Sequence, residues 1–87
     1  MTFHPNEILL KPYVTEKTLL MIEKENKLTF VVIKDATKVQ VRQAMEKLFS
    51  VEVEKVNFMV SKYGKKAIIT LKKDYNAEEL GMRLGIF

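Results

Sequence analysis

The sequence contains no cysteine and a single histidine, His4. Without cysteine, disulfides, thiolate metal sites and cysteine nucleophiles are excluded, and a reducing cytoplasm is the expected compartment. His4 lies in an N-terminal tail that we expect to fray, which argues against a metal ligand or general base. The motifs GxGxxG, GK[ST] and HExxH are also absent. We therefore expect no cofactor, no metal site and no enzymatic activity.

Long apolar runs and flexible linkers are also missing. No segment approaches the ~18 apolar residues of a membrane-spanning helix, so we expect neither membrane insertion nor export by a signal peptide. With three glycines and two prolines in 87 residues, the chain has no Gly/Ser linker, and it has no internal repeat. We expect one domain, residues 1–87, with a single modest core.

Acidic residues are absent from one long stretch. Between Lys55 and Lys73 there are six lysines and no Asp or Glu, although the net charge is only +4. This segregation predicts one cationic face, as in proteins that bind a polyanion. The alternative is that the lysines only protect a sheet edge from pairing with other strands.

The first half of the sequence predicts two strands and two helices. A strand over residues 7–11 ends at Pro12, and Thr15 is placed to cap a helix over residues 16–25. Residues 27–34 form a β-branched, aromatic segment typical of a central strand. Thr37 and Gln40 then form a capping-box pattern at the start of a second helix. Five apolar residues have the spacing of one buried helical face: Val41, Ala44, Met45, Leu48 and Phe49.

The second half predicts a hairpin and a short helix. Two strands flank the turn at Gly64, and Asn76 caps a last helix that carries Leu80 and Leu84 and closes at Gly85. The order is β-α-β-α-β-β-α. We expect an α+β fold with a four-stranded antiparallel sheet packed with helices, of the ferredoxin-like type.

The segment KKAIITLKKDY places a strand between two lysine pairs. Lysines across one hairpin can meet successive phosphates of folded RNA, and Tyr63 at the turn can stack on an unpaired base. For Tyr63, a simple turn aromatic is an equal alternative.

Several motifs resemble one family. KKAIITLKKDYNAEEL is similar to the signature of the L23 family of large-subunit ribosomal proteins, and KPYVTEK, KDATKVQVRQAMEKLF and VEVEKVNFMV follow in that family's order. The resemblance covers essentially the whole chain, and the short hairpin and RLGIF ending look archaeal. It implies a protein that binds large-subunit ribosomal RNA at the rim of the polypeptide exit tunnel, beside the L29 protein.

Carried over by position, the resemblance and the hairpin lysines give a set of RNA-facing candidates. They are Lys11, Tyr13, Thr15, Lys17, Lys34, Thr37, Lys38, Arg42, Asn57, Lys62, Tyr63, Lys65, Lys66 and Lys72. Thr15 and Thr37 rank below the lysines because a side chain that caps a helix is less free to bind phosphate.

The resemblance also implies a docking surface for factors that meet the emerging chain, with signal recognition particle and the translocon as partners. Glu16 and Phe49 match the family's docking residues, and for Phe49 core packing is the alternative. Ser50 replaces an acid, although Glu52 keeps negative charge nearby, so a contact of the trigger-factor type is in doubt. SKYGKK replaces the long basic loop that bacterial members extend into the tunnel.

Two other functions remain open on the sequence. A free-standing RNA-binding regulatory module would carry the same basic face. A small acylphosphatase-like hydrolase shares the size and charge, but it needs an arginine-bearing phosphate loop near the N-terminus, and Arg42 and Arg83 both fall on predicted helices.

Overall fold

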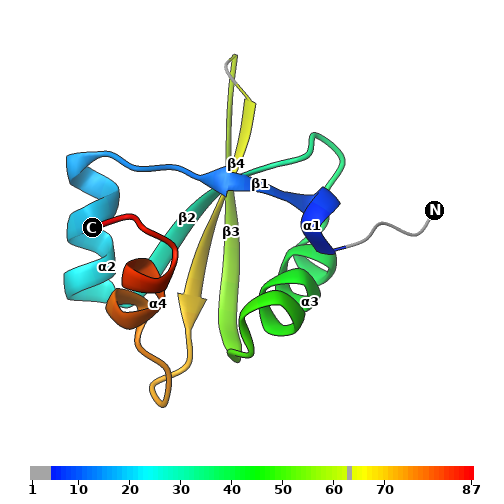
Figure 1. Ribbon diagram of the computed structural model, residues 1–87. Coiled ribbons are helices and arrows are strands. Elements are labelled where there is room, and N and C mark those ends of the chain that lie inside the picture. Colours follow the sequence, from blue (N-terminus) through cyan, green and yellow to red (C-terminus); the bar gives the residue numbers. More distant parts are fainter. Residues whose placement is uncertain (1–4, 63) are drawn as a thin grey trace.

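The computed structural model describes residues 5–62 and 64–87 and contains a four-stranded antiparallel sheet with helices against it (Figure 1). The strands lie in the order β1-β2-β4-β3. Along the chain the elements are α1 (Pro5–Ile8), β1 (Leu9–Pro12), α2 (Glu16–Glu25), β2 (Lys27–Val32), α3 (Lys38–Phe49), β3 (Val53–Ser61), β4 (Gly64–Leu71) and α4 (Ala77–Arg83). The predicted fold class and element order are confirmed, with the short α1 as an addition.

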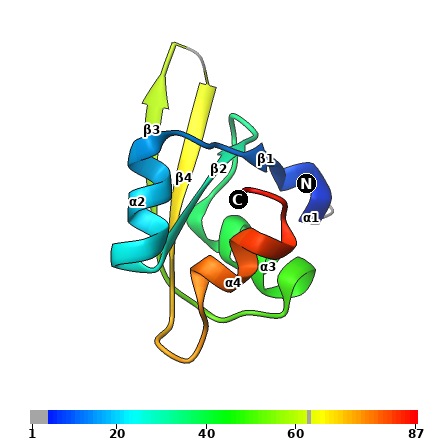
Figure 2. The same ribbon diagram turned by 60° about the vertical axis from the view of Figure 1, so that its left-hand side comes forward.

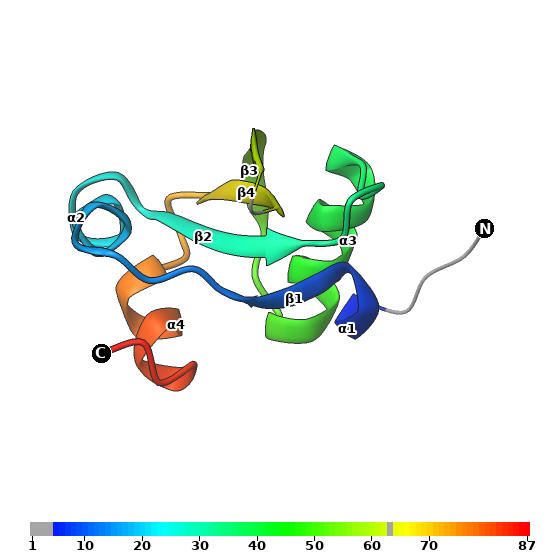
Figure 3. The same ribbon diagram turned by 90° about the horizontal axis from the view of Figure 1, so that it is seen from above.

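The molecule has three layers. In Figure 1 the strands are seen nearly edge-on, with α2 on one side of the sheet and α3 with α1 on the other. Figure 2 places α4 between α2 and α3, and α4 contacts α2 and β2. Seen from above, β2 runs from the end of α2 toward α3 (Figure 3). Each helix therefore covers only part of one sheet face.

The start of the chain departs from the predicted strand over residues 7–11. Glu7 and Ile8 belong to α1, and pairing with β2 starts at Leu9. Ile8 and Leu9 are both buried, which a strand with one solvent face does not allow for neighbouring residues. The helical turn lets α1 pack against α3 before the chain enters the sheet.

Helix α2 begins at the predicted cap, Thr15, and is also capped at its other end. The Thr15 hydroxyl accepts from the Thr18 backbone N–H at 3.1 Å, and the Thr18 hydroxyl accepts from the Thr15 N–H at 2.8 Å. Asn26 ends the helix in the left-handed conformation (φ 57°). The apolar residues of this helix are only partly covered, since Ile22 is buried while Leu20 is 49% exposed.

Helix α3 begins with the predicted capping box. The Gln40 N–H donates to the Thr37 hydroxyl (3.2 Å), and the Thr37 N–H donates to the Gln40 side chain (3.0 Å). Of the predicted apolar face, the first three residues are buried and Phe49 is half-buried, with its ring 6.0 Å from that of Phe30. Leu48 was wrongly placed in the core, since it is 43% exposed.

The hairpin and last helix follow the prediction. Gly64 has a φ of 130°, a conformation that L side chains rarely adopt, where β4 leaves the turn. The Asn76 side chain accepts from the N–H groups of Glu78 and Glu79 at 2.8 and 3.1 Å, which caps α4. Within residues 5–62 and 64–87, no helix is long and apolar enough to cross a membrane.

Candidate nucleic-acid interface

The strand register divides the sheet into two chemically different faces. Cross-strand partners share a face, and successive residues alternate between faces. Phe30, whose partner in β4 is Ala67, packs on Phe49 and so belongs to the face under α3. The neighbouring pair Thr29 and Ile68 belongs to the opposite face, which we call the α2 face.

The α2 face carries four lysines in rows of residues that are paired across the strands. One row runs from Lys11 through Val31 and Lys66 to Met59, the next contains Thr29, Ile68 and Asn57, and a third contains Lys27, Thr70 and Lys55. None of the paired residues in these three rows is acidic, although Glu54 lies next to Lys55 at the bulge of β3. Among the described residues, Lys27 is the one of these four lysines with an acidic partner, Glu25 at 3.2 Å.

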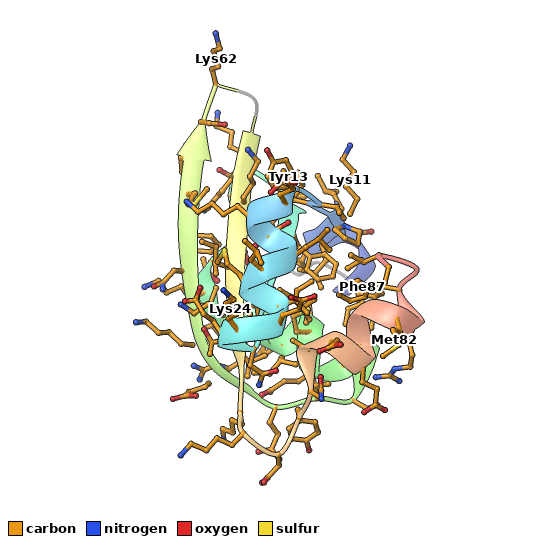
Figure 4. The ribbon with its side chains drawn as sticks, turned by 90° about the vertical axis from the view of Figure 1, so that its left-hand side faces the viewer. Lys11, Tyr13, Lys24, Lys62, Met82 and Phe87 are labelled. Atoms are coloured by element: carbon orange, nitrogen blue, oxygen red, sulfur yellow. The ribbon has the colours of Figure 1, made fainter. Side chains whose placement is uncertain are left out.

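A groove of about 590 Å³ runs between α2 and the α2 face. Its walls are apolar, and Lys17 from α2 and Lys66 from β4 line it together with Tyr13. The Lys66 ammonium lies 4.2 Å from the centre of the Tyr13 ring. Figure 4 looks onto α2 and shows Tyr13 at one end of this helix and Lys24 at the other.

The structure brings six predicted RNA-facing residues together around this groove and the sheet rows beside it. They are Lys11, Tyr13, Thr15, Lys17, Asn57 and Lys66. Thr15 is a cap of α2, as expected, but it also lines the groove.

The remaining candidates lie elsewhere. A second hollow of about 770 Å³, below the hairpin, is lined by Lys34, Lys62 and Lys65, and Lys62 stands at the hairpin tip (Figure 4). Thr37, Lys38 and Arg42 occupy the start of α3, where the Arg42 guanidinium is 3.5 Å from the Glu54 carbonyl oxygen. Lys72 follows the far end of β4. Tyr63 lies outside the described residues.

Lys65 already has partners within the fold. Its ammonium donates to the carbonyl oxygen of Ala36 at 2.6 Å and to that of Lys34 at 3.4 Å, and it lies 4.0 Å from the centre of the Phe58 ring. These contacts tie β4 to the loop that precedes α3. Lys65 therefore differs from Lys66, whose side chain lies on the α2 face.

Lys72 and Glu52 were predicted for different roles, but they contact each other. Their ion pair is 3.3 Å long, and the Tyr75 hydroxyl donates to the other Glu52 oxygen at 3.1 Å. The hydrogen bond from Tyr75 and the charge of Lys72 lower the pKa of Glu52, and the same carboxylate raises the pKa of Tyr75. All three groups are at the surface, so this pairing mainly reduces the local charge available to a partner.

The two principal docking candidates come from different layers. Glu16 is exposed in the first turn of α2, whereas Phe49 ends α3 on the other side of the sheet. The Phe49 ring packs on Phe30, which supports core packing for this residue. The Arg83 guanidinium, at the end of α4, donates to the Phe49 carbonyl oxygen at 3.5 Å, so α4 contacts the end of α3.

Two lysines of the α2 face, Lys27 and Lys55, were not among the predicted RNA-facing residues. Lys55 lies two residues before Asn57, so strand alternation alone could have placed it on the same face. Lys27 could not be placed without knowing how β2 pairs with β4. Among the described residues, no group of three or more His, Cys, Asp or Glu side chains could hold a metal ion.

A small α+β protein with an open, lysine-bearing sheet face has the build of an RNA-binding domain of the ribosomal type. The model of the family described as Ribosomal protein L23 matches residues 7–67, and the chain belongs to this family. Its members are structural proteins of the ribosome and not enzymes, as expected from the sequence.

Three archaeal relatives bear the description large ribosomal subunit protein uL23. The protein of Picrophilus torridus is 56% identical over 93% of this chain and 99% of its own length. The protein of Thermoplasma acidophilum is 49% identical over 93% of this chain and 96% of its own length. The protein of Methanothermobacter thermautotrophicus is 45% identical over 95% of this chain and 98% of its own length. These similarities confirm the resemblance, including its archaeal character.

Proposed function

We propose that this chain is a structural constituent of the large ribosomal subunit and binds large-subunit ribosomal RNA through the α2 face. The observation that carries this proposal is the arrangement of lysines on neighbouring strands of that face. Lys11, Lys55 and Lys66 project from three strands of one rigid sheet, and none of the residues paired with them across the strands is acidic. Such an array can meet several phosphates at once without first ordering a flexible segment.

The family supports a finer placement at the rim of the polypeptide exit tunnel, beside the L29 protein, in the cytoplasm. The described part of the hairpin is short, ending at Ser61 on one strand and resuming at Gly64 on the other. A hairpin of this length supports a position at the rim and not along the tunnel wall. The exposed side of α2 then offers a docking surface for signal recognition particle and the translocon.

The test of RNA binding uses the full chain and purified large-subunit ribosomal RNA. Changing Lys11, Lys55 and Lys66 together to Gln should weaken binding and reduce the slope of log affinity against log salt by about 0.7–0.9 for each lost phosphate contact. A flat salt dependence for the parent protein would contradict the proposal.

The control variant changes Lys24, Lys47 and Lys73 to Gln, which removes the same charge from exposed positions elsewhere. Lys24 lies at the end of α2 opposite Tyr13 (Figure 4). This control should retain most of the parent's salt slope. Equal losses in the two triple variants would mean that net charge, and not the α2 face, determines binding.

A further inference from the structure

The groove between α2 and the α2 face has a composition unlike the rest of the surface. Leu20 and Met21 from the helix face Met59 and Ile68 from the sheet, so both walls are apolar. Lys17 and Lys66 also line it. Its acidic residue, Glu25, is paired with Lys27 at 3.2 Å, so the lysines of the groove keep their net positive charge.

The groove also contains an unused hydrogen-bonding group. Thr29 lines it and is only 4% exposed, and its hydroxyl has no hydrogen-bond partner among the described residues. Buried hydroxyls are normally paired, so an unpaired one beneath a groove is a place where a ligand can supply the missing bond. Thr70, on the same sheet face, has a similar unpaired hydroxyl but does not line the groove.

We infer that this groove receives the base of one unpaired nucleotide of the bound RNA, with its flanking phosphates held by Lys17 and Lys66. This inference rests on the proposed RNA-binding function of the α2 face. A nucleotide combines a flat, largely apolar ring with an adjacent negative charge, which matches apolar walls next to lysines. The edge of the base would give the Thr29 hydroxyl the hydrogen bond that it lacks.

The position of Tyr13 fits the same occupant. Lys66 lies over one face of its ring, so the tyrosine and the lysine form a single wall in which an aromatic surface and a positive charge are adjacent. An apolar side chain of a protein partner would fill the walls but would leave both lysines without a counter-charge. The charge of the site therefore favours a nucleotide over a peptide segment.

The test compares a ten-nucleotide single-stranded RNA with a fully paired duplex of the same length, titrated against the full chain. Met59→Ser removes part of one wall, and Val60→Ser is its matched control, since Val60 is the next residue of β3 and faces the other side of the sheet. Met59→Ser should weaken binding of the single strand about fivefold or more, as for loss of one stacked base. Binding of the duplex, and the salt slope for both RNAs, should be unchanged.

Three further variants test the hydroxyl. Thr29→Val should weaken binding of the single strand several-fold, Thr29→Ser should restore it, and Thr70→Val should match the parent. Thermal unfolding of each variant identifies any loss that comes from stability alone.

The salt slope separates the two proposals. If the parent shows no salt dependence, RNA binding by the α2 face fails. If the slope persists but Met59→Ser binds single strands like Val60→Ser, the base-binding groove fails while the proposed function stands. If Met59→Ser and Thr29→Val bind RNA normally but enter large subunits poorly, the groove receives a protein side chain and the inference is overturned.

Discussion

Two adjacent lysines of β4 show how residue-level surroundings decide a role. Lys65 faces the loop before α3 and donates to two backbone carbonyl groups, whereas Lys66 faces the α2 face beside Tyr13. Alternation along the strand sends them to opposite sides of the sheet. A lysine pair in the sequence therefore contains one residue that holds the fold together and one that is free to meet a ligand.

We predict that Lys65→Met destabilises the domain and leaves its affinity for RNA nearly unchanged. Methionine keeps the apolar stem but leaves the Ala36 carbonyl without its charged donor, 2.6 Å away in the parent. A hydrogen bond to a charged group contributes about 1.5–3 kcal/mol. At about 4–8 °C per kcal/mol for a domain of this size, the unfolding midpoint should fall clearly.

Lys66→Met is the matched control at the next position. It should change the midpoint little, because its charge contacts only the Tyr13 ring, and it should weaken RNA binding with a smaller salt slope. The opposite pattern, with Lys65→Met stable and defective in RNA binding, would make Lys65 an RNA ligand.

At the scale of elements, Asn26 connects the ends of three of them. It closes α2 in the left-handed conformation, and its side-chain amide donates to the carbonyl oxygens of Leu71 at 3.3 Å and Tyr75 at 2.9 Å. Its side-chain oxygen accepts from the Ala77 N–H at 2.7 Å, at the start of α4. One residue therefore joins α2, the end of β4 and α4.

We predict that Asn26→Gly lowers the free energy of unfolding by about 1–3 kcal/mol, because glycine keeps the backbone conformation but loses these hydrogen bonds. Ser50→Gly is the control, since Ser50 ends α3 with nearly the same φ, 55°, and is exposed. The control should be neutral or slightly stabilising, because glycine adopts positive φ without strain. Denaturant unfolding measures both changes, and equal stability of the two variants would reduce Asn26 to an ordinary helix end.

The elements themselves were largely predictable because their signals are local. Thr37 with Gln40, and the spacing of Val41, Ala44 and Met45, identified α3 before any tertiary contact was known. Leu48 was misplaced because helical spacing identifies an apolar face but does not reveal which of its residues the rest of the fold covers. The short α1 was missed because four residues are too few to show a period, and its place depends on packing against α3.

The candidate site was less predictable, because it is assembled from long-range pairing. Lys11, Lys55 and Lys66 come from three strands and share a face only through the β1-β2-β4-β3 order. The groove depends on how α2 lies over that face. Neither the strand order nor the placement of α2 is encoded in a local sequence pattern. Residue types could therefore indicate RNA binding but not the surface that we propose for it.

At the scale of the whole molecule, α2 separates two surfaces of opposite charge. Lys17 lines the groove toward the sheet, whereas Glu16 and Glu23 flank Leu19 and Leu20 at a hollow on the helix. Neighbouring residues of a helix point in different directions, so this division follows from the sequence order Glu-Lys at the start of α2. RNA phosphates on the lysine side would repel the acidic side, which leaves that side available to a protein.

We predict that Glu16→Gln leaves incorporation into the large subunit intact but weakens recruitment of an exit-site factor, such as signal recognition particle, several-fold at low salt. Its carboxylate in the first turn of α2 stabilises the helix by only about 0.3–1 kcal/mol, too little for its loss to unfold the domain. Ion pairs at the rim of an interface mainly affect association and its salt dependence, so the defect should fade at high salt.

Glu78→Gln is the matched control, because Glu78 is also an exposed acid in the first turn of a helix, α4. Factor titrations on ribosomes of equal occupancy, at two salt concentrations, compare the variants. Identical curves for Glu16→Gln and Glu78→Gln would limit Glu16 to stabilising the start of its helix.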